Sequence, residues 1–206
     1  MADPTARPLV ALDPETALWE RVFVVAPLVV VGTEEVGGGY DLAPKHMAVP
    51  LGWGPYFGFV CTPRHATYRN AKREGAFTVT YVRPEQVVLA ALAAAPRTDG
   101  ADGPGAKPAL QTLPTAPARV VRGRFLADGY LFLECELDRV VDGFGVNSLI
   151  AGRVVAAYAA PEAVRLSDGS DAERLAADPL LAYLHPGRYA EVAETHAFPF
   201  PTGFSR

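Results

Sequence analysis

Short β-branched segments separated by glycine and proline turns constrain the fold more than any other feature of this sequence. Residues 22–31 are rich in valine, which favours an extended strand. The glycines at 37–39 adopt positive φ angles at little cost, so residues 22–31 and 40–43 are expected to pair as an antiparallel hairpin. Pro44 is expected to end the second of these strands.

Later segments repeat this pattern. An Asp-Gly turn at 127–129 predicts a tight hairpin between the strands on either side of it. In the second of these strands, Leu131 and Leu133 alternate with Phe132 and Glu134, which indicates one buried face and one wet face. Further strands are expected at residues 56–61, 77–82, 118–126, 130–141 and 152–158. The sequence therefore predicts a mainly β fold, a β-barrel of antiparallel, Greek-key-like strands with helical decoration.

The helical segments are fewer and shorter. Residues 67–74 predict a helix closed by Gly75, and residues 85–94 also favour a helix. Ser170 with Glu173 fits a capping box. That helix is expected to carry Leu175, Leu180, Leu181 and Leu184 and to end in a turn at residues 185–189. Residues 96–108 are rich in glycine, alanine and proline, and we expect a mobile surface loop there.

Size and charge narrow the classes of function. The chain has 206 residues, half of them apolar, and we expect one domain over residues 1–206 with an N-terminal arm and a C-terminal helix and tail. Its formal net charge of -4 disfavours nucleic acid or an anionic membrane as the main partner. Cys61 and Cys135 both lie in apolar strand patterns, so we expect two buried thiols and a reducing compartment. With no signal peptide and no stretch of transmembrane length, the protein is expected in the cytoplasm.

A basic turn before a short helix predicts an anion site. Arg64 can hold two phosphate oxygens, and Thr67 can donate at the start of the helix, where free N–H groups face the same anion. His65 and Asn70 complete this polar segment. In the alternative interpretation, Thr67 only caps the helix and Arg64 is a solvated surface charge.

The cysteines and histidines show no metal-ligand spacing, and neither a Rossmann fingerprint nor a serine nucleophile motif is present.

The order of these motifs resembles the flavin reductase-like family, which has the FMN-binding split-barrel fold. The resemblance rests on the glycine hairpin, the Ala43-Pro44 turn, the strand ending in Cys61 and the Arg-His-x-Thr-x-x-Asn segment at 64–70, followed by residues 75–79. It covers roughly residues 22–160 and is weaker through 133–137 and 150–154. The resemblance implies a homodimer that holds FMN near the subunit interface.

The resemblance also implies which residues hold the cofactor. A flavin ring needs an apolar shelf and a positive group near its N1 and O2 edge; Met47 can supply the first and Lys45 or His46 the second. The family commonly has serine or threonine in this turn, and singly Lys45 would be solvent-exposed and His46 an ordinary half-buried histidine. The cofactor-binding residues are predicted to be Ala43, Pro44, Lys45, His46, Met47, Cys61, Thr62, Arg64, His65, Thr67 and Asn70, with Thr62, Arg64, Thr67 and Asn70 at the phosphate.

The implied activity is transfer of hydride from NADH or NADPH to flavin, often for a partner monooxygenase, or electron carriage by bound FMN. No catalytic side chain is expected, because the flavin performs the redox step. His185, Arg188 and Tyr189 are candidates to close over a nicotinamide or the ring, although a plain helix-ending turn is the alternative. A noncatalytic FMN or ligand-binding barrel and a relative of the pyridoxamine phosphate oxidases remain alternatives. The tail aromatics Phe198, Phe200 and Phe204, with Pro199, are expected to anchor a partner subunit.

Overall fold

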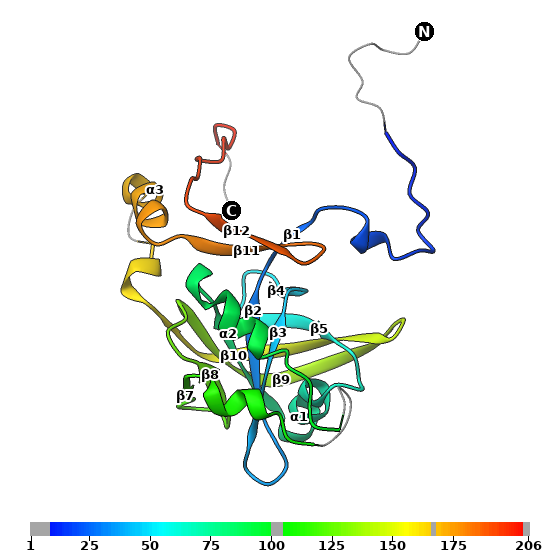
Figure 1. Cartoon of the computed structure of the whole chain (residues 1–206). Helices are drawn as coiled ribbons and strands as arrows, with labels where there is room; N and C mark the ends of the chain where they lie inside the picture. Colours follow the sequence, from blue (N-terminus) through cyan, green and yellow to red (C-terminus); the bar gives the residue numbers. More distant parts are fainter. Residues whose placement is uncertain (1–8, 100–104, 166–167, 204–206) are drawn as a thin grey trace.

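The computed structural model describes residues 9–99, 105–165 and 168–203. Its main element is a curled antiparallel sheet of seven strands in the order β3-β2-β6-β9-β10-β5-β4 (Figure 1). A three-stranded sheet, β1-β11-β12, lies against one end of it, and β7 pairs with β8. The strands are β1 Val25–Pro27, β2 Val29–Glu34, β3 Tyr40–Lys45, β4 Ala48–Pro50, β5 Tyr56–Cys61, β6 Ala76–Tyr81, β7 Thr115–Pro117, β8 Arg124–Leu126, β9 Leu131–Phe144, β10 Asn147–Ala159, β11 Leu180–Leu184 and β12 Arg188–Val192. The prediction of a mainly β fold is confirmed.

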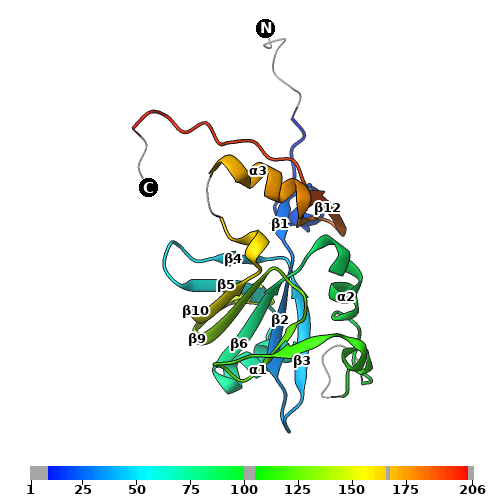
Figure 2. The same cartoon turned by 90° about the vertical axis from the view of Figure 1, so that its left-hand side faces the viewer.

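Three α-helices decorate the sheets. Figure 2 shows α1 at one end of the large sheet, α2 beside its β2–β3 edge, and α3 next to the small sheet. The helix before Gly75 ends as predicted, because Gly75 adopts the left-handed conformation with φ 66°. None of the helices in the described ranges is both long and apolar enough to span a membrane. The helices are α1 Ala66–Glu74, α2 Val87–Leu92 and α3 Asp168–Ala177, with short 3₁₀ turns η1 Leu18–Glu20, η2 Pro84–Gln86, η3 Pro108–Thr112 and η4 Pro161–Ala163.

The two edges of the large sheet approach each other at one point. Strands β3 and β4 form opposite edges of the sheet, yet only His46 and Met47 separate them in the chain. Three Cα–Cα steps of 3.8 Å allow at most about 11 Å between Lys45 and Ala48. The sheet must therefore roll into a half-barrel, and residues 45–48 bridge its split.

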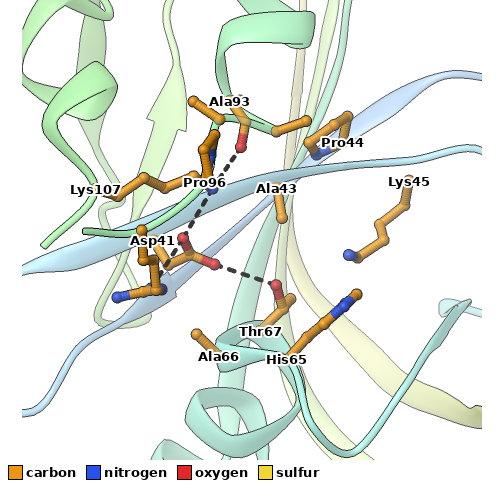
Figure 3. A pocket seen from close by; sticks show the side chains of 13 residues that line it. Asp41, Ala43, Pro44, Lys45, His65, Ala66, Thr67, Ala93, Pro96 and Lys107 are labelled. Carbon is orange, nitrogen blue, oxygen red and sulfur yellow. Dashed lines mark hydrogen bonds and ion pairs between the residues drawn. The ribbon is translucent and has the colours of Figure 1, made fainter. Parts of the chain in front are cut away.

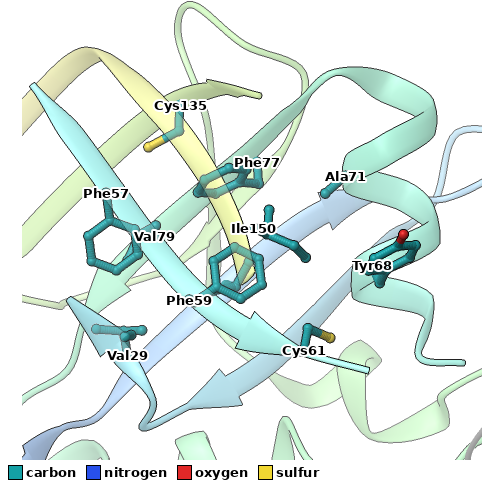
Figure 4. Packing of buried hydrophobic residues seen from close by; sticks show 12 residues of the cluster. Val29, Phe57, Phe59, Cys61, Tyr68, Ala71, Phe77, Val79, Cys135 and Ile150 are labelled. Atoms are coloured by element: carbon teal, nitrogen blue, oxygen red, sulfur yellow. The ribbon is translucent and has the colours of Figure 1, made fainter. Parts of the chain in front are cut away.

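Strand β2 separates two apolar cores. Val29 and Val31 face a cluster that includes Phe59 and Phe77, whose ring centroids lie 5.1 Å apart edge to face (Figure 4). Val30 points to the opposite side, into a second cluster beneath α2. Because both faces of β2 are buried, its first three residues are all valine. Cys61 and Cys135 are both buried free thiols, as the sequence predicted.

Two strand predictions near the N-terminus need correction. The segment 22–31 is not one strand: β1 pairs with β11 in the small sheet, whereas β2 pairs with β3 and β6. Pro27 lies at the break, where its missing N–H limits continued pairing. Pro44 does not end its strand, because β3 continues to Lys45. A proline is tolerated there because β3 is an edge strand with one unpaired side.

The Asp-Gly hairpin prediction was wrong. Asp128 does adopt a positive φ of 62°, but β8 pairs with β7, and β9 pairs with β6 and β10. The turn therefore passes the chain from one sheet to another, because long-range pairing with β6 replaces the local hairpin.

The predicted solvent-exposed face of β9 is also interrupted at Glu134. This residue is fully buried and accepts hydrogen bonds from the backbone N–H groups of residues 119–121.

The C-terminal helix is shorter than predicted. It begins at Asp168, so Ser170 lies inside its first turn and not at its cap, and it ends at Ala177. Pro179 cannot continue the helix, and Leu180, Leu181 and Leu184 belong to strand β11. Residues 185–187 therefore form the turn of the β11–β12 hairpin and not a helix end. Phe204 lies outside the described residues, whereas Phe198 and Phe200 are exposed and their ring centroids lie 4.6 Å apart.

Candidate functional site

Three hollows follow one another along the β3–β4 side of the half-barrel. The first and second share Pro44, and the second and third share His46. The first hollow lies between β3, the start of α1 and the segments around 93–97 and 107 (Figure 3). Its lining residues are Asp41, Ala43, Pro44, Lys45, His65, Ala66, Thr67, Ala93, Ala94, Ala95, Pro96, Arg97 and Lys107.

Asp41 is the centre of the first hollow's polar network. The Thr67 hydroxyl donates to Asp41 Oδ2 over 3.2 Å, which joins strand β3 to the first turn of α1. Asp41 Oδ1 lies 3.2 Å from both Lys107 Nζ and Arg97 Nη2. The carboxylate is almost fully buried. Through these contacts it joins β3 to the first turn of α1 and to the segments that carry Arg97 and Lys107.

The N-terminus of α1 opens onto this hollow. His65 occupies the cap position, but its side chain makes no capping hydrogen bond. Ala66 and Thr67 of the first helical turn line the hollow, and Figure 3 shows the Lys45 side chain extending toward His65. A helix N-terminus carries partial positive charge and leaves backbone N–H donors unpaired within the helix, so this end of the hollow favours an anion.

Sequence reasoning missed Arg97 and Lys107. Their side chains are only 7% and 8% exposed, although residues 96–108 were predicted to form a mobile surface loop. Lys107 Nζ donates to Asp41 and to the carbonyls of Leu42, at 2.8 Å, and Ala93. The one available signal was that Lys107 is among only three lysines in the chain.

The second and third hollows are mainly apolar. The second lies between α2 and the β11–β12 hairpin and is lined by Leu28, Pro44, His46, Val87, Ala90, Ala91, Tyr183, Gly187, Arg188 and Tyr189. The third has a volume of about 420 Å³ and is lined by Trp19, Val24, Val25, Ala26, Pro27, His46, Met47, Ala48, Val49, Gly58, Val60, Leu149 and His185. Together they provide apolar surface next to a first hollow that contains charged side chains.

A cluster of three rings separates these two hollows. The His46 imidazole stacks on Tyr183 with centroids 4.6 Å apart and planes at 17°, and His185 packs edge-on against His46 at 4.3 Å. Burial lowers the pKa of His46, and the neighbouring His185 and Lys45 lower it further. His46 is therefore a neutral ring at pH 7, which leaves Lys45 as the cation of this turn.

The predicted site residues divide into two groups. The first group lines the three hollows and comprises the residues on the β3 turn and at the helix start, together with His185, Arg188 and Tyr189. The fold thus brings Lys45 and His185 to neighbouring hollows, although they are 140 positions apart in sequence. Four others lie outside these linings. Cys61 and Thr62 are buried, and burial raises the pKa of the Cys61 thiol. Asn70 donates to Thr33 Oγ1 over 3.2 Å, and Arg64 is exposed.

Among the described residues, no group of metal-ligating side chains accompanies these hollows. Within residues 9–99, 105–165 and 168–203, no three His, Cys, Asp or Glu side chains are grouped so as to hold a metal ion. The site is instead a cationic pocket joined to apolar surface, the arrangement expected for a ligand with an anionic tail and a flat ring.

The comparisons with known proteins agree with this fold. A model of the flavin reductase like domain matches residues 21–192, and the chain therefore belongs to the flavin reductase-like family. No match was found among curated protein sequences.

Solved structures resemble the chain at low sequence identity. Nitrilotriacetate monooxygenase component B from Bacillus cereus has a TM-score of 0.76 at 20% identity, over 94% of this chain and 100% of that one. The FMN-binding protein from Thermus thermophilus has a TM-score of 0.71 at 21% identity, with 94% and 100% covered. A protein from Shewanella frigidimarina, assigned as a flavin reductase with a split barrel domain, has a TM-score of 0.72 at 18% identity, with 86% and 87% covered. The fold is a split barrel.

Proposed function

We propose that the protein binds FMN along the β3–β4 side of the barrel and reduces flavin with NADH or NADPH. The observation that carries this proposal is the change in charged lining residues along the three adjacent hollows. The first holds Lys45, Arg97, Lys107 and the α1 N-terminus, whereas Arg188 is the one Lys or Arg that lines the other two. FMN has the same order of groups, a phosphate at one end and a tricyclic ring at the other.

The residues present fit the two ends of this cofactor. Thr67 and the first turn of α1 are proposed to receive the phosphate, with Thr62, Arg64, His65 and Asn70 as the surrounding polar segment. Ala43, Pro44 and Met47 are proposed to contact the ring, beside Cys61 at the end of β5. When bound, FMN supplies the acceptor for hydride from the nicotinamide. Lys45 provides the fixed positive charge that favours the reduced ring, because His46 is neutral at pH 7.

The β11–β12 turn is proposed to hold the nicotinamide over the ring. Arg188 and Tyr189 line the second hollow, and His185 lines the third, so the turn contacts both apolar hollows. Tyr189 is 52% exposed and offers an aromatic face for stacking. Arg188 places a cation at the same turn, where it can pair with a phosphate of the dinucleotide.

We further propose that the protein works in the cytoplasm as a homodimer and that it supplies reduced flavin to a monooxygenase. Several large apolar side chains are exposed in the monomer, among them Trp53, Phe144 and Val146. Such surface is commonly covered by a partner. Phe198 and Phe200 in the tail are proposed to contribute to the same contact. The monooxygenase is suggested by the similar Bacillus cereus protein, which is itself a monooxygenase component.

A bound FMN that carries electrons, or binds without turnover, is the second candidate. It is favoured by the departure at Lys45-His46-Met47 from the small hydroxylic residues that this turn commonly has. A similar structure is also described only as an FMN-binding protein. Steady-state consumption of NADH and NADPH, with free FMN and FAD as acceptors, separates the two candidates.

The test begins with the visible spectrum of the purified protein and fluorescence titrations with FMN and FAD. Saturable FMN quenching and nicotinamide oxidation above the blank are the expected results. Lys45→Met should lower the oxidation rate by about tenfold, if the lost cation is worth about 1.4 kcal/mol to reduction. Lys72→Met is the matched control, because Lys72 is an exposed lysine on α1 that lines none of the three hollows. Binding without nicotinamide oxidation would favour the second candidate, and no binding would refute both.

A further inference from the structure

The first hollow contains two buried cations from a segment that the sequence motifs do not include. We infer that Arg97 and Lys107 bind the phosphate group of the flavin, and that Asp41 holds both cations in position as an internal anion until the phosphate enters. This inference rests on the proposed FMN site and adds the residues that make that site selective for a phosphorylated flavin.

Burial distinguishes these two cations from the arginine that sequence reasoning favoured. The Arg97 and Lys107 side chains are 7% and 8% exposed, whereas Arg64 is an exposed residue outside the lining of the hollow. Salt and water screen an exposed cation strongly, but they screen a buried cation much less. Arg97 and Lys107 therefore attract an anion in the hollow more strongly than Arg64 can.

The charge of the lining matches a phosphate monoester. Three cationic side chains, from Lys45, Arg97 and Lys107, face the hollow, and Asp41 is the one carboxylate among the lining residues. Burial lowers the pKa of Lys107 and Asp41 opposes that shift; the three acceptors around its Nζ match the three N–H groups of the ammonium form. Because Lys45 is proposed to serve the ring, Arg97 and Lys107 exceed Asp41 by one positive charge at this end, and the partial positive charge of the α1 N-terminus adds to it, so the hollow favours a phosphate.

The contacts around Asp41 are long enough to be exchanged. Its distances to Thr67 Oγ1, Lys107 Nζ and Arg97 Nη2 are all 3.2 Å. Charge-assisted hydrogen bonds are usually about 2.7 to 2.9 Å long. A single carboxylate therefore interacts with three donors. A phosphate, which has three terminal oxygens, can accept hydrogen bonds from some of these donors in its place.

The contacts of Arg97 and Lys107 also fix the segment that follows α2. Arg97 also pairs with Glu35 and donates to the Gly105 carbonyl over 2.9 Å, and Lys107 donates to the Ala93 carbonyl. Together with the ion pairs to Asp41 and the hydrogen bond from Lys107 to the Leu42 carbonyl, these contacts hold both ends of the segment against β3. Little side-chain entropy is then lost when the phosphate binds, which favours affinity.

The test compares the dissociation constants of FMN and riboflavin, which differ only by the phosphate. The ratio of the two constants isolates the phosphate contribution from any change at the ring. Lys107→Met and Arg97→Gln should each weaken FMN binding roughly 10- to 100-fold and leave riboflavin binding unchanged. Lys107→Arg, which keeps the charge, should retain most of the FMN preference, and Lys72→Met should leave the ratio unchanged.

Asp41→Asn tests the same inference, because its expected effect on the preference for FMN over riboflavin is opposite to that of Lys107→Met and Arg97→Gln. Removing the internal anion should keep or increase the preference for FMN, because the phosphate no longer competes with a carboxylate. A reduced preference would overturn the assignment of Asp41. Circular dichroism of each variant verifies folding, and if Lys107→Met fails to fold, Arg97→Gln and Lys107→Arg decide the result.

The outcomes distinguish this inference from the proposed function. If both flavins bind and their ratio is unchanged in Lys107→Met and Arg97→Gln, the inference is overturned while the FMN site stands. If neither flavin binds to the unmodified protein, the proposed function fails and the inference fails with it. A phosphate preference lost in both variants supports the two together.

Discussion

The buried Glu134 carboxylate should contribute strongly to stability. Its Oε2 accepts the backbone N–H groups of Val120 and Val121 at 2.6 and 2.8 Å. Its Oε1 accepts the N–H of Arg119 at 2.9 Å and the hydroxyl of Tyr158 at 3.0 Å. The carboxylate therefore fastens the 119–121 turn to the sheet, and Glu134→Gln removes the charge while keeping the shape.

The cost of Glu134→Gln follows from its four donors. The least disruptive glutamine places its amide nitrogen at Oε1, where the Tyr158 hydroxyl can turn and accept. The Arg119 N–H then faces a donor and loses its partner, which costs about 1 to 3 kcal/mol. The two bonds at Oε2 also lose their charge assistance, at about 1 kcal/mol each, so the expected loss is about 3 to 5 kcal/mol.

Urea unfolding of the two proteins measures this loss. With an m-value of about 2.5 kcal/mol/M, the midpoint should fall by about 1.2 to 2 M. The matched control is Glu136→Gln, because Glu136 is the next outward-facing glutamate of β9 and is exposed; its midpoint should change by less than about 0.2 M. Equal midpoints for the two variants would refute the reasoning. FMN affinity should not change, since Glu134 lines none of the three hollows.

The stability difference should also depend on pH. Burial raises the pKa of Glu134, but the three backbone donors and Tyr158 outweigh it and hold the pKa below its ordinary value of 4.5. The unfolded chain therefore binds the proton more readily, and stability increases with pH through this range. The advantage of the unmodified protein over Glu134→Gln should be complete above pH 4.5 and should shrink as the pH falls below it. A constant difference down to pH 3 would contradict the assigned cause.

Two further predictions concern close packing and a histidine. In Gly32→Ala, the new Cβ would lie 2.1 Å from the Arg124 carbonyl oxygen, so we expect a loss of at least about 3 kcal/mol in urea unfolding. Gly39→Ala is the control, because its Cβ would meet its nearest neighbour at 3.6 Å; similar losses in both would argue against the steric cause. The His46 imidazole should titrate below 6.5 by NMR, because burial and then His185 and Lys45 disfavour its proton. His185→Gln should raise that midpoint, and a midpoint at or above 6.5 in the unmodified protein would show that His46 is not held neutral.

Local patterns were predictable where one segment decides its own conformation. Strand β5 has the predicted bounds of 56–61, and α1 ends at Gly75 because a left-handed residue suits that position. The hairpin of β2 and β3 followed from the glycines at 37–39. Predictions failed where a distant partner competed, as when β9 paired with β6 and β10 and not with its neighbour β8.

The sequence by itself determined the type of fold, the family and the two basic turns, because periodicity, turn residues and motif order are local properties. Only the tertiary structure decided that Lys107 meets Asp41, 66 residues away, and that His46 stacks on Tyr183. These contacts depend on how the sheet rolls and which edges approach, and no short segment specifies that. The glycine- and proline-rich composition of residues 96–108 could indicate a loop, but only the tertiary structure shows that the cations at its ends are buried beside β3 and line the first hollow.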